Sequence, residues 1–121
     1  MLNSTINLLT IRSTDIDRAV SFYEILGLRF HKHSHGRGPE HYCSEDAGLT
    51  FEIYPLEAGK LPTTDTRLGF VVTSVDVAVS RLSEIGALLI SAPADSPWGR
   101  RAVMADFDGH RVEFTTKATL T

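Results

Sequence analysis

The feature that most constrains this chain is a helical pattern that occurs twice. Apolar residues with i, i+3, i+4, i+7 spacing begin at Ile16 and again at Val75, and each stripe stops at a glycine, Gly27 or Gly86. Both pairs are 59 positions apart. The spacing is typical of one face of an amphipathic α-helix, and the glycines favour helix ends. A constant offset along whole segments indicates an internal duplication, so we expect two similar halves.

Each predicted helix is preceded by one β-type segment and followed by three, which gives the order β-α-β-β-β in each half. The expected strands span 6–12, 28–30, 40–45 and 49–54, and then 68–73, 87–90, 101–106 and 110–115. A half of about 60 residues buries too little surface to be stable alone, so either the two halves pack together or two chains exchange halves to complete a core. We therefore expect one α+β domain whose sheets curve around a common concavity. Its expected parts are a first module at 1–57, a connector at 58–67 and a second module at 68–121.

Composition excludes several classes of function. The chain has 121 residues, 42% of them apolar, and a formal net charge of −3 without a run of Lys and Arg. Nucleic-acid binding through a basic patch is therefore not expected. No apolar run approaches the roughly 18 residues that a membrane span needs, and the N-terminus does not resemble a signal peptide. Cys43 is the single cysteine, which excludes an internal disulfide and suits a reducing cytosol, so we expect a cytoplasmic protein.

Glu52 and Glu113 occupy matching positions near the end of each half. In LTFEIY and HRVEFT, apolar residues alternate with polar ones, so both carboxylates should point away from the helices and into the concavity. Two carboxylates in one cleft can bind a metal ion or act as a general acid and a general base. Alternatively, they are solvated or salt-bridged side chains on an open sheet face. The residues alone leave both interpretations open.

Two segments resemble a known superfamily. DIDRAVSFYEILGLRF at 15–30 and WGRRAVMADFDGHRVEF at 98–114 are similar to motifs of the vicinal oxygen chelate superfamily, which includes glyoxalase I, the bleomycin-resistance proteins and the extradiol dioxygenases. The resemblance extends over nearly the whole chain. It implies paired βαβββ modules around a U-shaped cleft, commonly in a homodimer. Because the superfamily contains several chemistries as well as non-enzymes, the resemblance predicts the fold and not the reaction.

The resemblance also implies where a divalent metal such as Ni, Zn, Fe or Mn would bind. Metal-dependent members take ligands from the first and last strand of each module, and Glu52 and Glu113 match the last-strand ligands. The matching first-strand positions are Leu8 and Arg67, or Asn7 in place of Leu8 after a shift of one residue. Leucine and arginine cannot bind a cation, and asparagine is a poor ligand for a transition metal. We therefore expect an incomplete metal site, in which Arg67 either neutralises the glutamates or binds an anionic ligand.

Four further residues are candidates for ligand binding. Trp98 lies in a loop with Pro and Gly, where a tryptophan either stacks on a ligand or anchors the loop. Tyr54 shares the face of Glu52. His41 lies on a strand expected to line the cleft, as a ligand contact or a substitute metal ligand. Arg101, close to Trp98 in the sequence, completes the set.

Other reactive side chains are expected to be structural. Tyr23 belongs to the helix stripe and is predicted to lie in the core. Cys43 is predicted to be a small buried residue. Asp106 and Asp108 are typical of a tight turn rather than a calcium loop. His110, beside that turn, is expected to be partly exposed.

The stretch HKHSH places histidines at 31, 33 and 35, which would align on one face of a strand. Metal chelation by His-x-His is one interpretation. The repeat, however, places this stretch at the outgoing end of a strand that leads into a hairpin, and its counterpart 90–94 is expected to be a strand end. None of the three histidines falls at a ligand position implied by the resemblance. We expect a polar rim at the mouth of the cleft.

Three functions follow as hypotheses. The first is a small-molecule-binding protein of the bleomycin-resistance type, which holds a ligand in its cleft without the full metal site. The second is a metal-dependent lyase or isomerase resembling glyoxalase I, with Glu52 and Glu113 as metal ligands and proton-transfer groups. The third is a catalytically silent domain with an interaction role. Metal content separates the first two hypotheses.

Overall fold

The chain folds into two modules with the same order of elements. The computed structural model describes residues 2–97 and 99–116. Within these residues the first module contains β1 (Leu8–Ser13), α1 (Ile16–Ile25), β2 (His31–His33), β3 (His41–Asp46) and β4 (Leu49–Pro55). The second contains β5 (Arg67–Val71), α2 (Val75–Glu84), β6 (Leu88–Ser96), β7 (Gly99–Ala105) and β8 (Arg111–Thr115). The expected α+β fold with two β-α-β-β-β units is confirmed.

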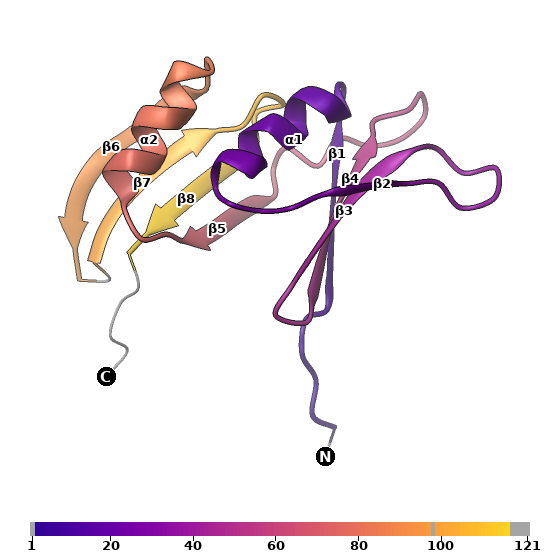
Figure 1. The fold of residues 1–121 in the computed structure, drawn as a ribbon, viewed down its shortest axis with the longest axis horizontal. Helices are drawn as coiled ribbons and strands as arrows, with labels where there is room; N and C mark the ends of the chain where they lie inside the picture. The colour runs from indigo at the N-terminus through magenta and orange to yellow at the C-terminus, as the bar shows by residue number, and fades with distance from the viewer. Residues whose placement is uncertain (1, 98, 117–121) are drawn as a thin grey trace.

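Each module forms its own four-stranded mixed sheet. The strand orders are β1-β4-β3-β2 in the first sheet and β5-β8-β7-β6 in the second. In each sheet the first and last strands of the module pair in parallel, and the other neighbours are antiparallel. Figure 1 shows the sheets on the two sides of the molecule, with both helices above them. The duplication therefore sets both the order of elements and their pairing.

The helix ends follow from local chemistry. The Asp15 carboxylate accepts a hydrogen bond from the Arg18 backbone N–H, and the Ser74 hydroxyl accepts one from the Val77 N–H. Each N-cap satisfies a backbone donor in the first turn that has no partner within the helix. After each helix the chain turns at a glycine with positive φ, 94° at Gly27 and 93° at Gly86, a conformation that side chains with a Cβ disfavour. The duplicated caps thus fix both helices.

The core lies between the helices and one face of each sheet. Tyr23, as expected, is fully buried, and its ring packs edge-on against Phe51 with a centroid distance of 5.0 Å. Its ring also lies 5.9 Å from that of Phe70 in the other module. Burying an aromatic or large aliphatic side chain contributes about 1.5–3 kcal/mol. These aromatic contacts join the two modules through one shared core.

A buried polar network also joins the modules. The Tyr23 hydroxyl donates to Asp106 Oδ2 at 2.6 Å, and His110 Nδ1 lies 2.9 Å from the same oxygen. The other carboxylate oxygen, Oδ1, accepts from the backbone N–H groups of Asp108, Gly109 and His110. The tight turn expected at Asp106 and Asp108 is thus present. The expected exposure of His110 is wrong, because its ring is fully buried as a partner of Asp106.

Three boundaries differ from the sequence-based expectation. Residues 28–30 are not a strand, because β2 begins only at His31 and pairs with β3 through three residues. The counterpart segment 90–94 is not a strand end, since β6 continues to Ser96 through register shifts against β7. β5 begins at Arg67, inside the expected connector. Edge strands such as β2 and β6 have a partner on one side only, so hydrophobic pattern alone defines their limits poorly.

Neither helix in the described part of the chain is long and apolar enough to cross a membrane.

Candidate functional site

The open face of the first sheet is its face away from the helices, and it carries two rows of polar side chains. The first row follows the strand pairing from Thr10 to Glu52, then to Cys43 and His31. The Thr10 hydroxyl donates to Glu52 Oε1 at 2.8 Å, and the Cys43 thiol lies 3.7 Å from Glu52 Oε2. Both carboxylate oxygens are therefore held in place by side chains on neighbouring strands.

The second row is formed by the next side chains on the same face of these strands. His41 stacks on Tyr54 with a ring separation of 4.0 Å and an angle of 9° between the planes. Arg12 lies over the outer part of this row, 5.9 Å from the Tyr54 ring centre. On the other side, His33 and His35 approach the His41 ring at 6.2 and 5.2 Å. The row forms a continuous aromatic and imidazole surface.

His41 is the buried member of this row. Its side chain is 1% exposed, and its Nδ1 lies 3.1 Å from the carbonyl oxygen of Pro39. A carbonyl only accepts, so Nδ1 carries the proton and donates it. Among the described residues, its Nε2 is buried without a hydrogen-bond partner. Nε2, the nitrogen without a hydrogen-bond partner, is therefore the one with a free lone pair.

Cys43 and Glu52 affect each other's environment. Burial and the neighbouring Glu52 carboxylate raise the pKa of the Cys43 thiol, so the thiol keeps its proton at neutral pH when no cation is present. The expectation that Cys43 is a buried residue is wrong. The side chain is half-buried and lies across the strand pair from Glu52.

The open face of the second sheet has different chemistry. Glu113 accepts a hydrogen bond from Arg101 Nε, and both side chains are about one-third exposed. Arg67 and Arg111 are cross-strand partners on the same face. The residue beside Glu113 on β5 is Gly69, which offers no side chain. Within the described chain, this face therefore carries three arginines and one glutamate, which is already paired, and Asp65 and Asp108 line the hollow next to Arg67 and Arg111.

The metal ligands implied by the resemblance do not form a set in this structure. The residue directly beside Glu52 on β1 is Thr10, and Leu8 pairs one step away with Thr50. The matching residue beside Glu113 is Gly69, and Glu113 is bound by a guanidinium. Neither a leucine, a glycine nor an arginine can ligate a cation. Among the described residues, Glu113 also belongs to no group of three or more close metal-ligating side chains.

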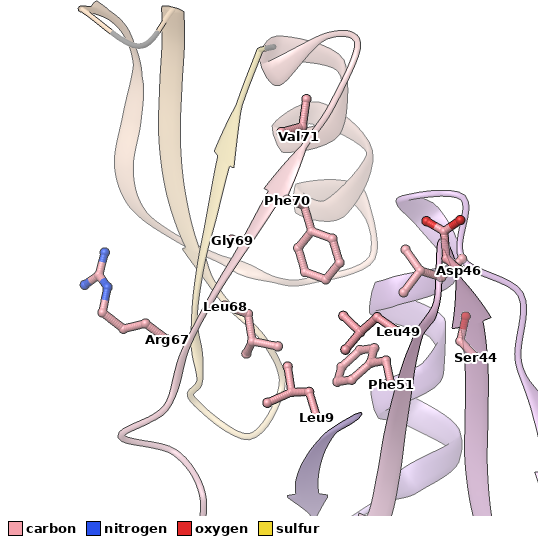
Figure 2. Close-up of a pocket in the computed structure, with 11 residues that line it drawn as sticks. Leu9, Ser44, Asp46, Leu49, Phe51, Arg67, Leu68, Gly69, Phe70 and Val71 are labelled. Carbon is pink, nitrogen blue, oxygen red and sulfur yellow. The ribbon is translucent and has the colours of Figure 1, made fainter. Parts of the chain in front are cut away.

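A cavity of about 410 Å³ lies at the seam between the modules. Figure 2 shows Leu68 and Phe70 of β5 pointing toward Leu9, Leu49 and Phe51 of the first module. Arg67 projects to the opposite side of β5 in the same view. The cavity is mainly apolar and lies on the helix side of both sheets. Of the predicted site residues that the structure describes, Arg67 is the one that also lines this cavity.

The predicted site residues divide between the two faces. Tyr54, His41 and Glu52 lie together on the first sheet. The other described members, Arg67, Arg101 and Glu113, lie together on the second. Trp98 falls outside the described residues. Sequence reasoning missed Cys43 as a neighbour of Glu52; the strand alternation of HYCSE with LTFEIY was the signal that could have found it.

Nor did the sequence predict three hydrogen-bonded side chains at the seam between the modules: a hydroxyl, an imidazole and a carboxylate. Thr63 Oγ1 lies 2.7 Å from His110 Nε2, and His110 Nδ1 contacts Asp106. Such an order is used by nucleophilic enzymes. Here the Thr63 oxygen also accepts from the Arg12 N–H at 2.9 Å, and the imidazole is fully buried. The three side chains therefore tie the connector to both modules and are structural.

Comparisons with known proteins agree with this architecture. The family model described as Glyoxalase/Bleomycin resistance protein/Dioxygenase superfamily matches residues 5–114. An uncharacterized protein from Mycolicibacterium smegmatis is 24% identical over 116 residues, which cover 94% of this chain and 95% of that protein.

Solved structures match over almost their whole length. TnmS3, an antibiotic binding protein from Streptomyces sp. CB03234, superposes with a TM-score of 0.77 at 23% identity, covering 98% of this chain and 99% of that one. The oxidase ChaP-H2 gives a TM-score of 0.72 at 20% identity, covering 96% and 95%. TioX from Micromonospora sp. ML1 gives 0.70 at 24% identity, covering 93% and 98%. These likenesses concern the fold. Because the family model covers nearly all of the two-module chain, this protein belongs to the glyoxalase/bleomycin resistance protein/dioxygenase superfamily.

Proposed function

We propose that this protein binds a planar aromatic molecule that carries an acidic group, and that the open faces of the two sheets hold it. The observation that carries the proposal is the stacked pair of Tyr54 and His41, whose rings are 4.0 Å apart. Because His41 is buried within this pair, the half-buried Tyr54 ring is the aromatic surface on which a planar ligand can stack. Binding proteins of this fold exist, since TnmS3 is described as an antibiotic binding protein.

The second sheet supports the acidic part of the ligand. Arg67 and Arg111 are cross-strand partners, and Arg67 points away from the apolar seam (Figure 2). A guanidinium offers two parallel N–H donors that match a carboxylate or phosphate. Since Arg101 is paired with Glu113, Arg67 and Arg111 are the guanidinium groups proposed for an anion.

A metal-dependent lyase or isomerase of the glyoxalase I type is less well supported by the donor set. Such an enzyme would use Glu52 and Glu113 with ligands from the first strands. The neighbours at those positions are Thr10 and Gly69, which supply neither imidazole nor carboxylate. Glu113 is in addition neutralised by Arg101. Ligand binding without the family's metal chemistry therefore fits these side chains better.

We also propose that two copies form a homodimer in which the first module of one chain faces the second module of the other. This pairing would bring the aromatic surface and the arginines to the same ligand. The strand β6 supports it, because Leu88, Leu89 and Ile90 are 40–64% exposed at a sheet edge. Light scattering should give a molar mass of about twice 13.3 kDa. A monomer at all concentrations would contradict the dimer.

Calorimetry with matched ligands tests the proposed ligand class. Planar aromatic carboxylates should bind, and the corresponding neutral amides should bind about tenfold more weakly, because a charge-assisted hydrogen bond is lost. Arg67→Ala should weaken only the carboxylates, whereas Tyr54→Ala should weaken both series by about tenfold. Arg37→Ala, in an exposed loop, is the matched control and should change neither series. Equal binding of carboxylates and amides would overturn the anionic part of the proposal.

A further inference from the structure

Three different metal-ligating side chains lie together in the first module. One ring nitrogen of His41, the Cys43 sulfur and a Glu52 carboxylate oxygen are within 4.8 Å of one another. A tetrahedral zinc ion bound by such atoms would space them roughly 3.4–3.6 Å apart, given metal–ligand lengths of about 2.0–2.3 Å. The sulfur and Glu52 Oε2 are already 3.7 Å apart. Small side-chain rotations would therefore bring the three donor atoms to a metal-binding arrangement.

The unpartnered nitrogen of His41 is independent evidence for a ligand. Its ring is 1% exposed, yet Nε2 has no hydrogen-bond partner in the described part of the chain. A buried polar atom without a partner is costly, so native structures rarely contain one without a reason. Nδ1 donates to the carbonyl of Pro39, which leaves the lone pair on Nε2. A histidine that binds a metal has this same arrangement, with one nitrogen held by a carbonyl and the other free for the ion.

Neighbouring side chains also fix the positions of the metal-ligating groups. Thr10 donates to Glu52 Oε1, which turns Oε2 toward the Cys43 sulfur. Stacking on Tyr54 fixes the plane of the His41 ring. One thiolate and one carboxylate carry two negative charges, which a divalent cation balances. Such outer contacts position metal ligands and are part of a metal site.

We propose that the first module binds one divalent cation of the zinc class through His41 Nε2, the Cys43 thiolate and the Glu52 carboxylate. On binding, Cys43 releases its thiol proton to solvent and a sulfur–metal bond forms. A mixed nitrogen, sulfur and oxygen set suits zinc and its substitutes cobalt and nickel. Three protein ligands leave a fourth position for water or a small molecule. The site lies within one sheet, and it does not depend on Glu113, on the second module or on the proposed ligand.

Cobalt is a suitable probe because it reports a bound thiolate. The protein, without a histidine tag and treated with a chelator, should take up one Co²⁺ per chain and develop a thiolate-to-cobalt charge-transfer band. Zn²⁺ should bleach that band by displacement. Cys43 is the single cysteine in the chain, so its alkylation gives a second readout. Zn²⁺ should slow alkylation by at least about tenfold, because the metal-bound sulfur is shielded.

Variants identify the ligands. Cys43→Ser should remove the band, and Glu52→Gln should weaken Co²⁺ binding by about 10- to 100-fold, at least as much as loss of an outer-shell contact does. Glu113→Gln is the matched control from the second repeat and should leave Co²⁺ affinity unchanged. His41→Gln tests the nitrogen ligand, with circular dichroism to verify its fold.

The exposed histidines at 31, 33 and 35 provide the competing explanation, since they can bind stray metal. The triple alanine variant should keep the charge-transfer band and the protection of Cys43. Two results would overturn the proposal. One is the absence of a thiolate band in the wild-type protein. The other is Co²⁺ binding that survives Cys43→Ser and Glu52→Gln but is lost in the triple variant.

Discussion

The two repeats place a glutamate at the same point of their last strand but give it different neighbours. Glu52 receives a hydrogen bond from Thr10 and faces the thiol of Cys43. Glu113 is held by Arg101 and lies beside Gly69, which has no side chain. The duplication therefore preserved the path of the backbone, while the side chains on neighbouring strands decided what each carboxylate can bind. One face carries the proposed cation ligands, and the other has its glutamate paired with Arg101.

The turns before the two last strands differ in the same way. Asp46 begins the turn in the first module and is exposed. Asp106 begins the turn in the second module and is 5% exposed, with Tyr23 and His110 as partners. The second turn is hydrogen-bonded to the first module, through Tyr23 to Asp106 and through Thr14 to Asp108. The aspartate that begins each turn is therefore exposed to solvent in the first module and belongs to the shared core in the second.

The largest expected effect is on stability, from Asp106→Ala. This substitution leaves the Tyr23 hydroxyl and the His110 ring without their buried acceptor, and losing one partner of such a network costs about 3–5 kcal/mol. The matched substitution in the other repeat, Asp46→Ala, should change the free energy of unfolding by less than about 0.5 kcal/mol, as is usual at an exposed site. Chemical denaturation of both variants measures the contrast. Equal decreases in the free energy of unfolding for the two variants would contradict the proposed difference between the turns.

The contrast between the turns should also depend on pH. Burial alone would raise the pKa of Asp106, but hydrogen bonds from His110 and Tyr23 outweigh it and lower that pKa below the ordinary 3.8. A lowered pKa stabilises the folded state at pH values above 3.8, and this contribution is lost as the pH falls through the folded value.

The stability advantage of the wild-type protein over Asp106→Asn should therefore shrink in acid. Denaturation at a series of pH values from neutral to below 3.8 tests this. The difference between the wild-type protein and Asp46→Asn should stay nearly constant across the same series. A constant difference for Asp106→Asn as well would show that Asp106 does not titrate with folding.

A smaller effect on stability is expected from the hydrogen bond between Glu52 and Thr10, its neighbour on the first strand. Thr10→Val removes the hydroxyl that donates to Glu52 while keeping the side-chain shape. Because the pair is half-buried, we expect a loss of about 1 kcal/mol in the free energy of unfolding. Thr50→Val, at a half-buried position on the same face, should cost clearly less. Losses of equal size in the two variants would mean that the hydrogen bond to Glu52 adds nothing.

The smallest expected effect is a gain, from making the second repeat resemble the first. Gly69→Thr places a β-branched residue in β5, and a Cβ there would lie 3.9 Å from Glu113 Oε2, an ordinary contact. Glycine in a strand interior costs about 0.5–1 kcal/mol relative to alanine, so the variant should unfold at a higher denaturant concentration. A decrease in stability would show that the open face of β5 has no room for a side chain.

Several features could be predicted from the sequence because they depend on local chemistry. The helices at 16–25 and 75–84 follow from their apolar stripes and N-caps, and the last strands follow from alternation. The faces of Glu52 and Glu113 follow from the same alternation. The limits of β2 and β6 did not follow, because an edge strand has neighbours on one side only and its pattern is weak.

The candidate metal site required the tertiary structure. His41, Cys43 and Glu52 come from two strands; alternation predicts the face of each side chain, but the strand register is what sets Cys43 opposite Glu52. The burial of His110 also required it, because a histidine beside a turn is usually exposed unless a distant residue such as Tyr23 closes over it.

The sequence by itself determined the duplication, the two helices and the polar face of the last strand in each module, because periodicity and capping act between residues that are close along the chain. The tertiary structure decided which polar residues meet. Strand register set the neighbours of each glutamate, and packing between the modules set the buried network at Asp106. Register and module packing bring together residues distant along the chain, so the chemistry of the two matched faces could diverge while their sequence pattern stayed alike.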